Sequence, residues 1–427
     1  MTPLEHNQSK YISLREKFPV FHFDHFIYTI NQNDIQVQYF YHSEEIIFKP
    51  TIKIQFGKYL SQNISPESIE GFLFNIGLIE LISYWKCVAS PIVEIHPFTL
   101  NKEQENWWKK LYYKGLGEYF YQNTISFSSN DFLNFQYDQN AKPYSSLHFE
   151  PISVSNRVII PIGGGKDSVV TLEHFLYNQK DVIPFIINPR GATLDCAKVA
   201  GFETLHDVFV IHREIDLLLI QLNQKGYLNG HTPFSAMLAF YTALVGFITN
   251  TREIALSNEA SANEATIPGT DINHQYSKSL EFEQDFQKYV QKYMNDSVHY
   301  FSFLRPLSEL EIAEKFAQYK QYHPVFKSCN AGSKENKWCC NCPKCLFAYI
   351  ILSPYLSTNE LVDIFGEDLL NKPTLNSYFE ELTGIADVKP FECVGTIEEV
   401  NEAIRMIIPY QKDKYLIQNY ITKTNNK

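Results

Sequence analysis

The chain has 427 residues, of which 44% are hydrophobic and 20% charged, a balance typical of soluble globular proteins. This length predicts two or three domains, each large enough to bury an apolar core. The formal net charge of -11 disfavours a polyanionic partner, so we expect no nucleic acid as the main ligand. The first residues, MTPLEHNQSKYISLREKF, lack the apolar core of a secretory signal, which predicts a cytoplasmic protein.

The region from residue 1 to 150 is rich in aromatic residues and predicts an α+β domain. The alternating run Ile35 to Tyr41 is typical of a strand, and helical periodicity follows at Gly71 to Cys87 and at Glu105 to Tyr121. The spacing of its residues contains no catalytic signature. We expect this domain to hold the substrate, with simple packing as the alternative.

From residue 151 to 305 short apolar runs alternate with helical segments. The runs are Val158 to Ile162, Val182 to Pro189, Val208 to His212 and Glu253 to Glu259. Continuous apolar runs separated by helices predict a parallel sheet with crossover helices, hence a doubly wound α/β domain.

Two further segments predict helices. Met237 to Ile248 is apolar but too short to cross a bilayer, so it predicts a buried helix and no membrane insertion. Ser308 and Glu311 form a capping-box pattern at the start of a helix that should end by Pro324. Residues 306–427 predict a helical C-terminal region that carries a cysteine cluster.

Three consecutive glycines occur in VIIPIGGGKDSVV, between a predicted strand and a predicted helix. A glycine-rich turn that opens a helix offers free N–H groups and a positive helix end to an anion, which predicts a phosphate site. Lys166 and Ser168 are placed to meet phosphate oxygens and Asp167 to meet a divalent cation. Neither standard nucleotide fingerprint matches, because both GxxxxGK[ST] and GxGxxG are missing. The predicted phosphate-binding residues are Gly163, Gly164, Gly165, Lys166, Asp167 and Ser168.

This loop resembles the SGGKDS loop of the PP-loop ATP pyrophosphatase superfamily. The resemblance implies an adenine nucleotide alpha hydrolase-like fold and cleavage of ATP to AMP and pyrophosphate, usually with adenylation of a substrate. Gly163 stands where that pattern usually has serine, which removes one hydroxyl from the pyrophosphate site. The alternative is a glycine-rich turn that binds no ligand.

Five of the eight cysteines lie in SCNAGSKENKWCCNCPKC. The CxxCxxC spacing of the last three predicted ligands, with a more distant cysteine as the fourth, predicts a structural tetrahedral zinc site. Cys340 occupies an intervening position and is expected not to bind the ion. Unligated thiols or a redox switch are the alternatives. The cluster resembles the zinc site of cyano-deazaguanine synthase, another PP-loop enzyme, and its predicted ligands are Cys329, Cys339, Cys342 and Cys345.

Longer stretches resemble the MurL family of UDP-N-acetylmuramoyl-L-alanyl-L-glutamate epimerases. They are LNGHTPFSAMLAF, ALSNEASANEATIPGTDINHQYSKSLEFE, WCCNCPKC and FNIGLIELISYWKC. The resemblance implies that a UDP-linked muramoyl dipeptide, a peptidoglycan precursor, is the substrate and that its terminal L-Glu becomes D-Glu. It also implies that ATP yields AMP and pyrophosphate through an acyl-adenylate and that Mg2+ is required.

Roles within this reaction can be assigned in part. Inversion needs an acid/base group on each face of the α-carbon or one mobile group, and the candidates are His231, His274 and Lys278. Their alternative roles are phosphate contact and structural hydrogen bonding. Thr232 and Pro233 predict an N-cap and N1 pair, which would place His231 at a helix start. Candidates for Mg2+ or the substrate carboxylates are Asp167, Asn258, Glu259, Glu264, Tyr276, Ser277, Arg190 and Arg305, with a solvated loop as the alternative for the residues at 258–264.

Two other functions remain open at this point. A PP-loop amidating or thiolating ligase would need ammonia or sulfide for pyrophosphate release, and a nucleotide-binding sensor would keep the fold without turnover. The Lys166, Asp167 and Ser168 set argues against the sensor. The oligomeric state and the number of bases stay undetermined.

Overall fold

The computed structural model describes residues 3–60, 64–126, 132–267, 270 and 272–425. The chain forms two compact units, and each consists of three segments. Unit 1 comprises Met1–Ile159, Phe209–Ile254 and Asp271–Tyr300, and unit 2 comprises Ile160–Val208, Ala255–Thr270 and Phe301–Lys427. Both α-helices and β-strands contribute, so the protein has a mixed α/β fold.

The strands of unit 1 are β1 (Val20–Ile30), β2 (Asp34–Ser43), β3 (Ile46–Phe48), β4 (Thr51–Gln55), β5 (Ile92–Ile95), β6 (Phe98–Thr99), β7 (Asn134–Tyr137), β8 (Lys142–Pro143) and β11 (Phe209–Glu214). Its helices are α1 (Pro3–Lys17), α2 (Pro66–Trp85), α3 (Lys102–Gly115), α4 (Gly117–Gln122), α7 (Leu217–Gln224), α8 (Phe234–Thr249) and α9 (Leu280–Tyr293). The chain passes from unit 1 to unit 2 within β9 (Arg157–Pro161), β12 (Glu253–Leu256) and β13 (His299–Ser302). Unit 2 also contains β10 (Asp181–Ile187), α5 (Lys166–Tyr177), α6 (Ala192–Val199), α10 (Glu309–Gln318), α11 (Pro343–Leu352), α12 (Thr358–Phe365), α13 (Asn376–Thr383), α14 (Ile397–Gln411) and α15 (Tyr415–Asn425).

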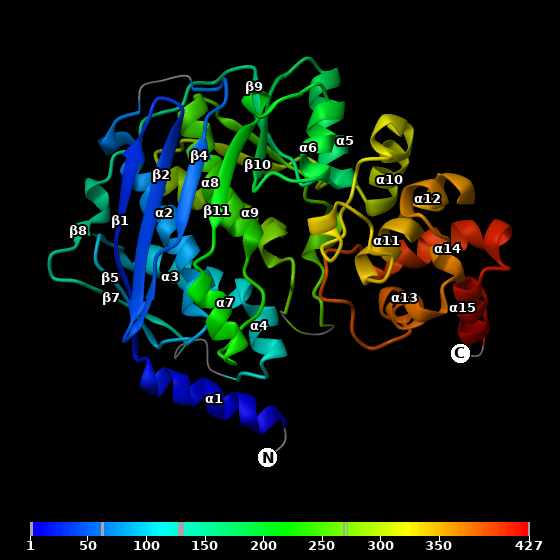
Figure 1. The fold of residues 1–427 in the computed structure, drawn as a ribbon, viewed down its shortest axis with the longest axis horizontal. Coiled ribbons are helices and arrows are strands. Elements are labelled where there is room, and N and C mark those ends of the chain that lie inside the picture. Colours follow the sequence, from blue (N-terminus) through cyan, green and yellow to red (C-terminus); the bar gives the residue numbers. More distant parts are fainter. Residues whose placement is uncertain (1–2, 61–63, 127–131, 268–269, 271, 426–427) are drawn as a thin grey trace. The chain divides into compact units, whose positions relative to one another are not determined.

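The sheet of unit 1 follows the strand order β11, β4, β2, β1, β5, β7, and β1, β2, β4 and β11 run side by side in Figure 1. The first four of these strands are antiparallel, whereas β1, β5 and β7 are parallel. The predicted strand at Ile35 to Tyr41 is confirmed as part of β2, whose burial alternates with period two. One face of β2 is therefore buried, and the other is more exposed.

Helix α2 covers the buried face of this sheet. Tyr39 and Tyr41 of β2 donate hydrogen bonds to the backbone oxygens of Leu73 and Gly77, at 2.9 and 2.8 Å. A Cβ at Gly77 would lie 2.5 Å from Cζ of Phe23, so glycine allows the close approach of helix and sheet. The predicted helix at 71–87 is thus confirmed, although it begins earlier, at Pro66 behind a capping box at Ser65.

The expectation of an all-parallel sheet around β11 is wrong in one respect. β11 pairs antiparallel with β4, with Val210 opposite Gln55. The antiparallel run β1, β2 and β4 supplies this partner, and such long-range pairing leaves no local trace in the β11 sequence. The expected parallel pairing is found between β9 and β12.

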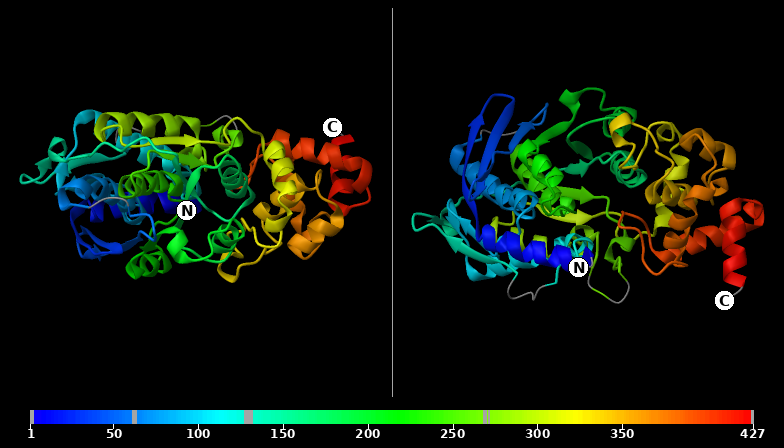
Figure 2. Two further views of the ribbon diagram at one scale, coloured as in Figure 1. Left: turned by 90° about the horizontal axis from the view of Figure 1, so that it is seen from above. Right: turned by 60° about the horizontal axis from the view of Figure 1, so that its bottom comes forward.

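In unit 2, helix α5 begins immediately after the glycine loop. Its first residue is Lys166, its N-cap is Gly165, and Val169, Val170 and Leu172 form its buried side. Helix α10 packs on α5 and on α11, and α11, α13, α14 and α15 continue the helical assembly seen in yellow to red in Figure 2. The predicted capping box of Ser308 and Glu311 is confirmed, although α10 ends at Gln318, well before Pro324. The described chain beyond it contains helices α11 to α15.

Met237 to Ile248 lies within the buried helix α8, as predicted. Across the described part of the chain, we find no helix with both the length and the apolar character needed to cross a membrane.

Candidate functional sites

The glycine loop between β9 and α5 contains one position that requires glycine for reasons within the protein. Gly164 has φ of +81°, and a Cβ there would lie 2.8 Å from the backbone carbon of Ala192. By contrast, a Cβ at Gly163 would meet nothing within 4 Å. The backbone of α6 thus excludes a side chain at Gly164, whereas space at Gly163 is left for a ligand or for a larger residue.

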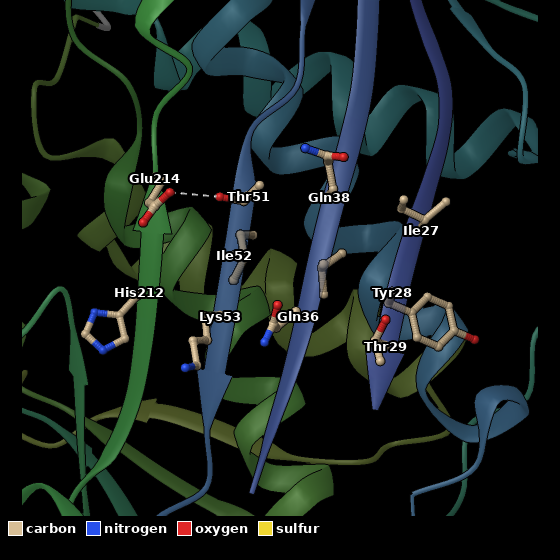
Figure 3. Close-up of a pocket in the computed structure, with 11 residues that line it drawn as sticks. Ile27, Tyr28, Thr29, Gln36, Gln38, Thr51, Ile52, Lys53, His212 and Glu214 are labelled. Carbon is tan, nitrogen blue, oxygen red and sulfur yellow. Dashed lines mark hydrogen bonds between the residues drawn. The ribbon is translucent and has the colours of Figure 1, made fainter. Parts of the chain in front are cut away.

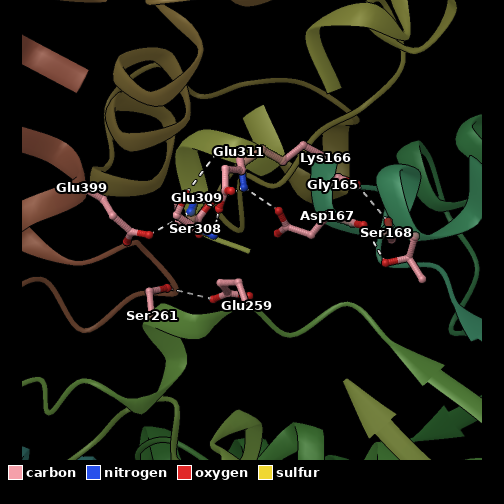
Figure 4. Close-up of polar contacts among 11 residues, drawn as sticks. Gly165, Lys166, Asp167, Ser168, Glu259, Ser261, Ser308, Glu309, Glu311 and Glu399 are labelled. Carbon is pink, nitrogen blue, oxygen red and sulfur yellow. Dashed lines mark hydrogen bonds and ion pairs between the residues drawn. The ribbon is translucent and has the colours of Figure 1, made fainter. Parts of the chain in front are cut away.

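Lys166 is buried and lies between two carboxylates (Figure 4). Its Nζ lies 2.5 Å from Oδ1 of Asp167 and donates a hydrogen bond to Oε2 of Glu309 in α10. The two carboxylates raise the pKa of Lys166, although burial opposes them. Burial raises the pKa of Glu309, and the charges of Asp167 and Glu259 act in the same direction. One ammonium thus faces an excess of acidic groups, an arrangement that fits a divalent cation.

The backbone and side chains that follow β12 are held by a second set of polar contacts. Nδ2 of Asn258 donates to Oγ of Ser302 at 3.0 Å, and Nη1 of Arg305 donates to the backbone oxygen of Glu259 at 2.8 Å. Ser261 donates to Oε1 of the buried Glu259 at 3.2 Å. Arg305 therefore positions the backbone of Glu259.

The remaining predicted residues of unit 2 differ in their surroundings. Glu264 forms an ion pair with Lys389, so its carboxylate is already partly neutralised. The side chain of Ser168 donates to the backbone oxygen of Gly165 at 2.9 Å, which closes the first turn of α5. Arg190 is exposed, and its backbone N–H is bound by Thr193 at 3.0 Å.

The four predicted cysteine ligands come together in unit 2. All four sulfur atoms lie within 4.8 Å of one another. The distances are 3.4 Å for Cys342 to Cys345, 3.7 Å for Cys339 to Cys345 and 3.9 Å for Cys329 to Cys342. A tetrahedral zinc ion with Zn–S bonds of about 2.3 Å needs sulfur separations of about 3.8 Å, so the donor set fits zinc. Cys340 lies outside the set, and its Sγ donates to the backbone oxygen of Phe365 at 3.0 Å.

Unit 1 contains a compact acid/base cluster that joins two of the predicted catalytic residues. The ring centroids of His231 and His274 are 4.5 Å apart. Oε2 of the buried Glu118 makes a short contact with Nδ1 of His274 and lies 3.6 Å from Nδ1 of His231. Burial lowers the pKa of His231 to about 3, with the charges of His274 and Lys86 acting in the same direction. His231 is therefore a neutral base at ordinary pH.

Lys86 at the end of α2 completes this cluster. Its Nζ donates hydrogen bonds to the backbone oxygen of Gly230 and to Oγ1 of Thr232, the latter at 2.7 Å. This bond explains why the predicted N-cap at Thr232 is wrong. Its hydroxyl is engaged by Lys86, α8 begins at Phe234, and Pro233 occupies the N-cap position. Burial lowers the pKa of Lys86 to about 8.

Sequence reasoning missed Lys86 and Glu118. A signal existed for Lys86, because it is the single basic residue in the mostly apolar stretch FNIGLIELISYWKC. Glu118 lies in the short helix α4 and is recognisable only once the fold brings α4 to His274.

The third predicted acid/base residue, Lys278, is half-buried and follows Tyr276 and Ser277 in one 3-10 turn. Tyr276 and Ser277 are both buried. The ring of Tyr276 packs near Phe282 and under the ammonium of Lys114. Within the surrounding motif, Pro268, Gly269 and Asp271 lie outside the described residues.

A pocket of about 520 Å³ lies on the strands of unit 1 and is shown in Figure 3. Side chains from β1, β2, β4 and β11 line it, among them Gln36, Lys53 and Glu214. The described residues that line this pocket include none of the predicted site residues.

The sequence matches the MurL N-terminal domain over residues 13–303 and the MurL C-terminal domain over residues 325–427. The chain belongs to the MurL family. The curated relatives it resembles include proteins named UDP-N-acetyl-alpha-D-muramoyl-L-alanyl-L-glutamate epimerase from three bacteria. Identity is 33% to the protein of Xanthomonas oryzae pv. oryzae, covering 77% of this chain and 73% of the relative. It is also 33% to those of Micromonospora sp. and Salinispora tropica, covering 76% of this chain and 72% and 70% of the relatives.

The two MurL matches divide the sites between them. The glycine loop, Glu259 and the acid/base cluster all fall within the MurL N-terminal match, whereas the four cysteines fall within the MurL C-terminal match.

Proposed function

We propose that the chain converts the terminal L-Glu of UDP-N-acetylmuramoyl-L-alanyl-L-glutamate to D-Glu, with ATP cleaved to AMP and pyrophosphate, in peptidoglycan precursor synthesis. The observation that carries the proposal is the similarity, at 33% identity over about three quarters of the chain, to relatives named as epimerases of this substrate. The coupling to ATP is supported by the glycine loop and its buried Lys166.

The chemistry of the substrate explains why ATP would be used. The two diastereomers differ little in free energy, so ATP has to lower a barrier and not shift an equilibrium. A carboxylate repels further negative charge, so the neighbouring carbon holds its proton tightly. Transfer of AMP to the carboxylate gives a mixed anhydride whose acyl group is uncharged, with pyrophosphate as leaving group. Every 1.4 kcal/mol removed from the barrier to proton abstraction then accelerates that step about tenfold.

The loop residues bind and orient the nucleotide in this proposal. The N-terminus of α5 and the ammonium of Lys166 attract phosphate oxygens, and Gly163 leaves space for them beside the backbone. Asp167 and Glu259 are the carboxylates we assign to Mg2+, which when bound would offset phosphate charge. Glu264 is a weaker ligand candidate because Lys389 is already paired with it.

The acid/base cluster of unit 1 moves the proton. His231 is neutral and can accept a proton, and Glu118 can orient His274 and stabilise its charged form. The centroid separation of 4.5 Å is too short for a carbon to lie between the two rings, because each contact with carbon needs about 3.5–4.0 Å. We therefore assign both histidines to one face of the α-carbon, with Lys278 as the candidate for the opposite face. Hydrolysis of the anhydride then releases the D-product and AMP.

The four cysteines hold zinc in this proposal. A site closed by four thiolates leaves no open position for a substrate, so the ion would stabilise the fold of the loop at 329–345. Chemistry at the α-carbon is assigned to the acid/base cluster and to Lys278.

The test is proton exchange in D2O. With dipeptide substrate, ATP and Mg2+, we expect deuterium at the α-carbon of the released glutamate together with pyrophosphate. His274→Gln should abolish deuterium incorporation yet leave nucleotide binding intact, whereas Lys166→Met should abolish both nucleotide binding and exchange. Pyrophosphate release that depends on ammonia or sulfide, with no deuterium in the product, would overturn the proposal in favour of a ligase.

A further inference from the structure

A second cluster of metal-ligand side chains lies on the sheet of unit 1, on β1 and β2 and at the end of β5. It contains three histidines and two carboxylates, and we call it the strand cluster: His22, Asp24, His42, Glu94 and His96. The proposed epimerase reaction uses none of these residues, and none lines the pocket of Figure 3.

Strand register brings the cluster together. His22 of β1 is paired directly with His42 of β2 on one side and with Glu94 of β5 on the other. Directly paired residues project from the same face of a sheet, with Cβ atoms about 4.5–5.5 Å apart. Asp24 follows two residues after His22 in β1, and His96 follows two residues after Glu94, one position past the end of β5. The backbone N–H of His96 donates to the oxygen of Phe23 at 3.0 Å. The five side chains therefore form a small grid across three strands.

The donor groups of His22, Glu94 and His96 are separated by the distances expected between the ligands of one metal ion. Nδ1 of His22 lies 3.3 Å from Nε2 of His96, Oε1 of Glu94 lies 3.2 Å from Nε2 of His96, and the other carboxylate oxygen, Oε2, lies 3.8 Å from Nδ1 of His22. A tetrahedral ion with bonds of about 2.0–2.1 Å to nitrogen and oxygen places its ligands about 3.3 Å apart. Two imidazole nitrogens and a carboxylate thus converge on one point with a matching geometry.

The other two residues surround this trio. The ring of His42 stacks on His22 with centroids 4.1 Å apart, and its Nδ1 lies 2.8 Å from Oδ2 of Asp24. Oδ1 of Asp24 lies 3.8 Å from Nδ1 of His96, the nitrogen on the far side of the ring from the trio. A carboxylate behind a ligating histidine orients its ring and increases its basicity, a usual feature of protein metal sites.

We propose that His22, Glu94 and His96 bind a divalent transition-metal ion of the zinc class, with Asp24 and His42 as supporting residues. Imidazole and carboxylate donors select Zn2+ and its neighbours over Mg2+ or Ca2+. The five side chains keep between 21% and 33% of their surface exposed, so an ion can enter from solvent. The ion would join β5 to β1 and thereby strengthen the parallel side of the sheet.

The experiment uses the full chain with its cysteine site filled with zinc and excess metal removed by a weak chelator. We would titrate Zn2+ by calorimetry and Co2+ by visible absorption into the native protein and into His96→Ala, Glu94→Gln, Asp24→Asn and His25→Ala. His25 is an exposed histidine of the same strand, stacked on Phe40, and serves as the matched control. His274→Gln reports on the trio of Glu118, His231 and His274, whose donor atoms also lie within 4.8 Å.

We expect one additional ion in the native protein, with Co2+ bands that lack thiolate charge transfer. His96→Ala and Glu94→Gln should weaken its binding at least 100-fold and Asp24→Asn about 10- to 100-fold, while His25→Ala and His274→Gln leave it unchanged. Added Zn2+ should raise Tm of the native protein but not of Glu94→Gln, a near-isosteric variant that we expect to fold. Equal binding by the native protein and Glu94→Gln, or loss of the ion in His274→Gln alone, would overturn the proposal.

Discussion

Removal of Lys166 should make the stability of the protein strongly dependent on pH. In Lys166→Met, the carboxylate of Glu309 loses its ammonium partner while only 4% of its side chain is exposed. Glu309 then stays neutral in the folded protein at pH 7, because burial and the charge of Asp167 already raise its pKa. Holding a glutamate neutral at pH 7, when its unfolded pKa is about 4.3, costs about 3.7 kcal/mol, and at pH 5 about 1.0 kcal/mol.

The raised pKa of Glu309 makes the Lys166→Met variant less stable as pH rises. The folded pKa of Glu309 in the variant lies above the unfolded value, so its contribution to stability is complete below about pH 4.3 and is lost as pH rises toward the folded pKa. The matched control is Lys166→Met/Glu309→Gln, which lacks the titrating group.

Thermal melting of the two variants, followed by circular dichroism at pH 5 and pH 7, measures the difference. The Tm gap between them should widen by about 5–11 °C from pH 5 to pH 7, at about 2–4 °C per kcal/mol for a unit of this size. A gap that stays constant over this range would refute the reasoning, since it would mean that Glu309 does not titrate in the folded variant.

Three further predictions concern the other sites. Gly164→Ala should weaken ATP binding at least tenfold in calorimetry because its Cβ would lie 2.8 Å from the Ala192 backbone, whereas Gly163→Ser, with open space, should bind at least as well as the native chain. Cys342→Ser should lose its zinc in elemental analysis, whereas Cys340→Ser, outside the sulfur cluster, should keep it, and equal zinc contents would contradict the ligand assignment. The pKa of His231 is about 3 in the folded protein, below its unfolded value, so the neutral buried side chain favours folding above the unfolded pKa and this stability is lost as pH falls. His231→Gln should therefore reduce the loss of stability between pH 6.5 and pH 5 by up to about 2 kcal/mol. Unchanged acid sensitivity would argue against a buried neutral His231.

Sequence patterns within single segments predicted individual helices and strands correctly. Period-two burial marks β2, the apolar stretch at 237–248 lies within α8, and the capping box at Ser308 begins α10. The four zinc ligands were also predictable as a group, because three of them, Cys339, Cys342 and Cys345, lie within seven residues and need only tight turns to converge.

Pairings between distant segments could not be predicted in this way. Glu309 lies 143 positions from Lys166, and Glu118 lies 156 positions from His274. The antiparallel contact of β4 with β11 and the register that aligns His22 with Glu94 likewise depend on the sheet as a whole. In the three side-chain pairings one partner is an ordinary acidic residue, Glu309, Glu118 or Glu94, whose chemical importance becomes visible only when its neighbour is known.

The measurement that tests the central proposal most directly is chiral analysis of the glutamate released by acid hydrolysis after incubation of the chain with UDP-N-acetylmuramoyl-L-alanyl-L-glutamate, ATP and Mg2+. Pyrophosphate should be quantified in the same samples. The proposal predicts D-Glu that accumulates together with AMP and pyrophosphate, and no D-Glu when ATP is omitted. Glutamate that stays entirely in the L form while pyrophosphate is released would contradict it.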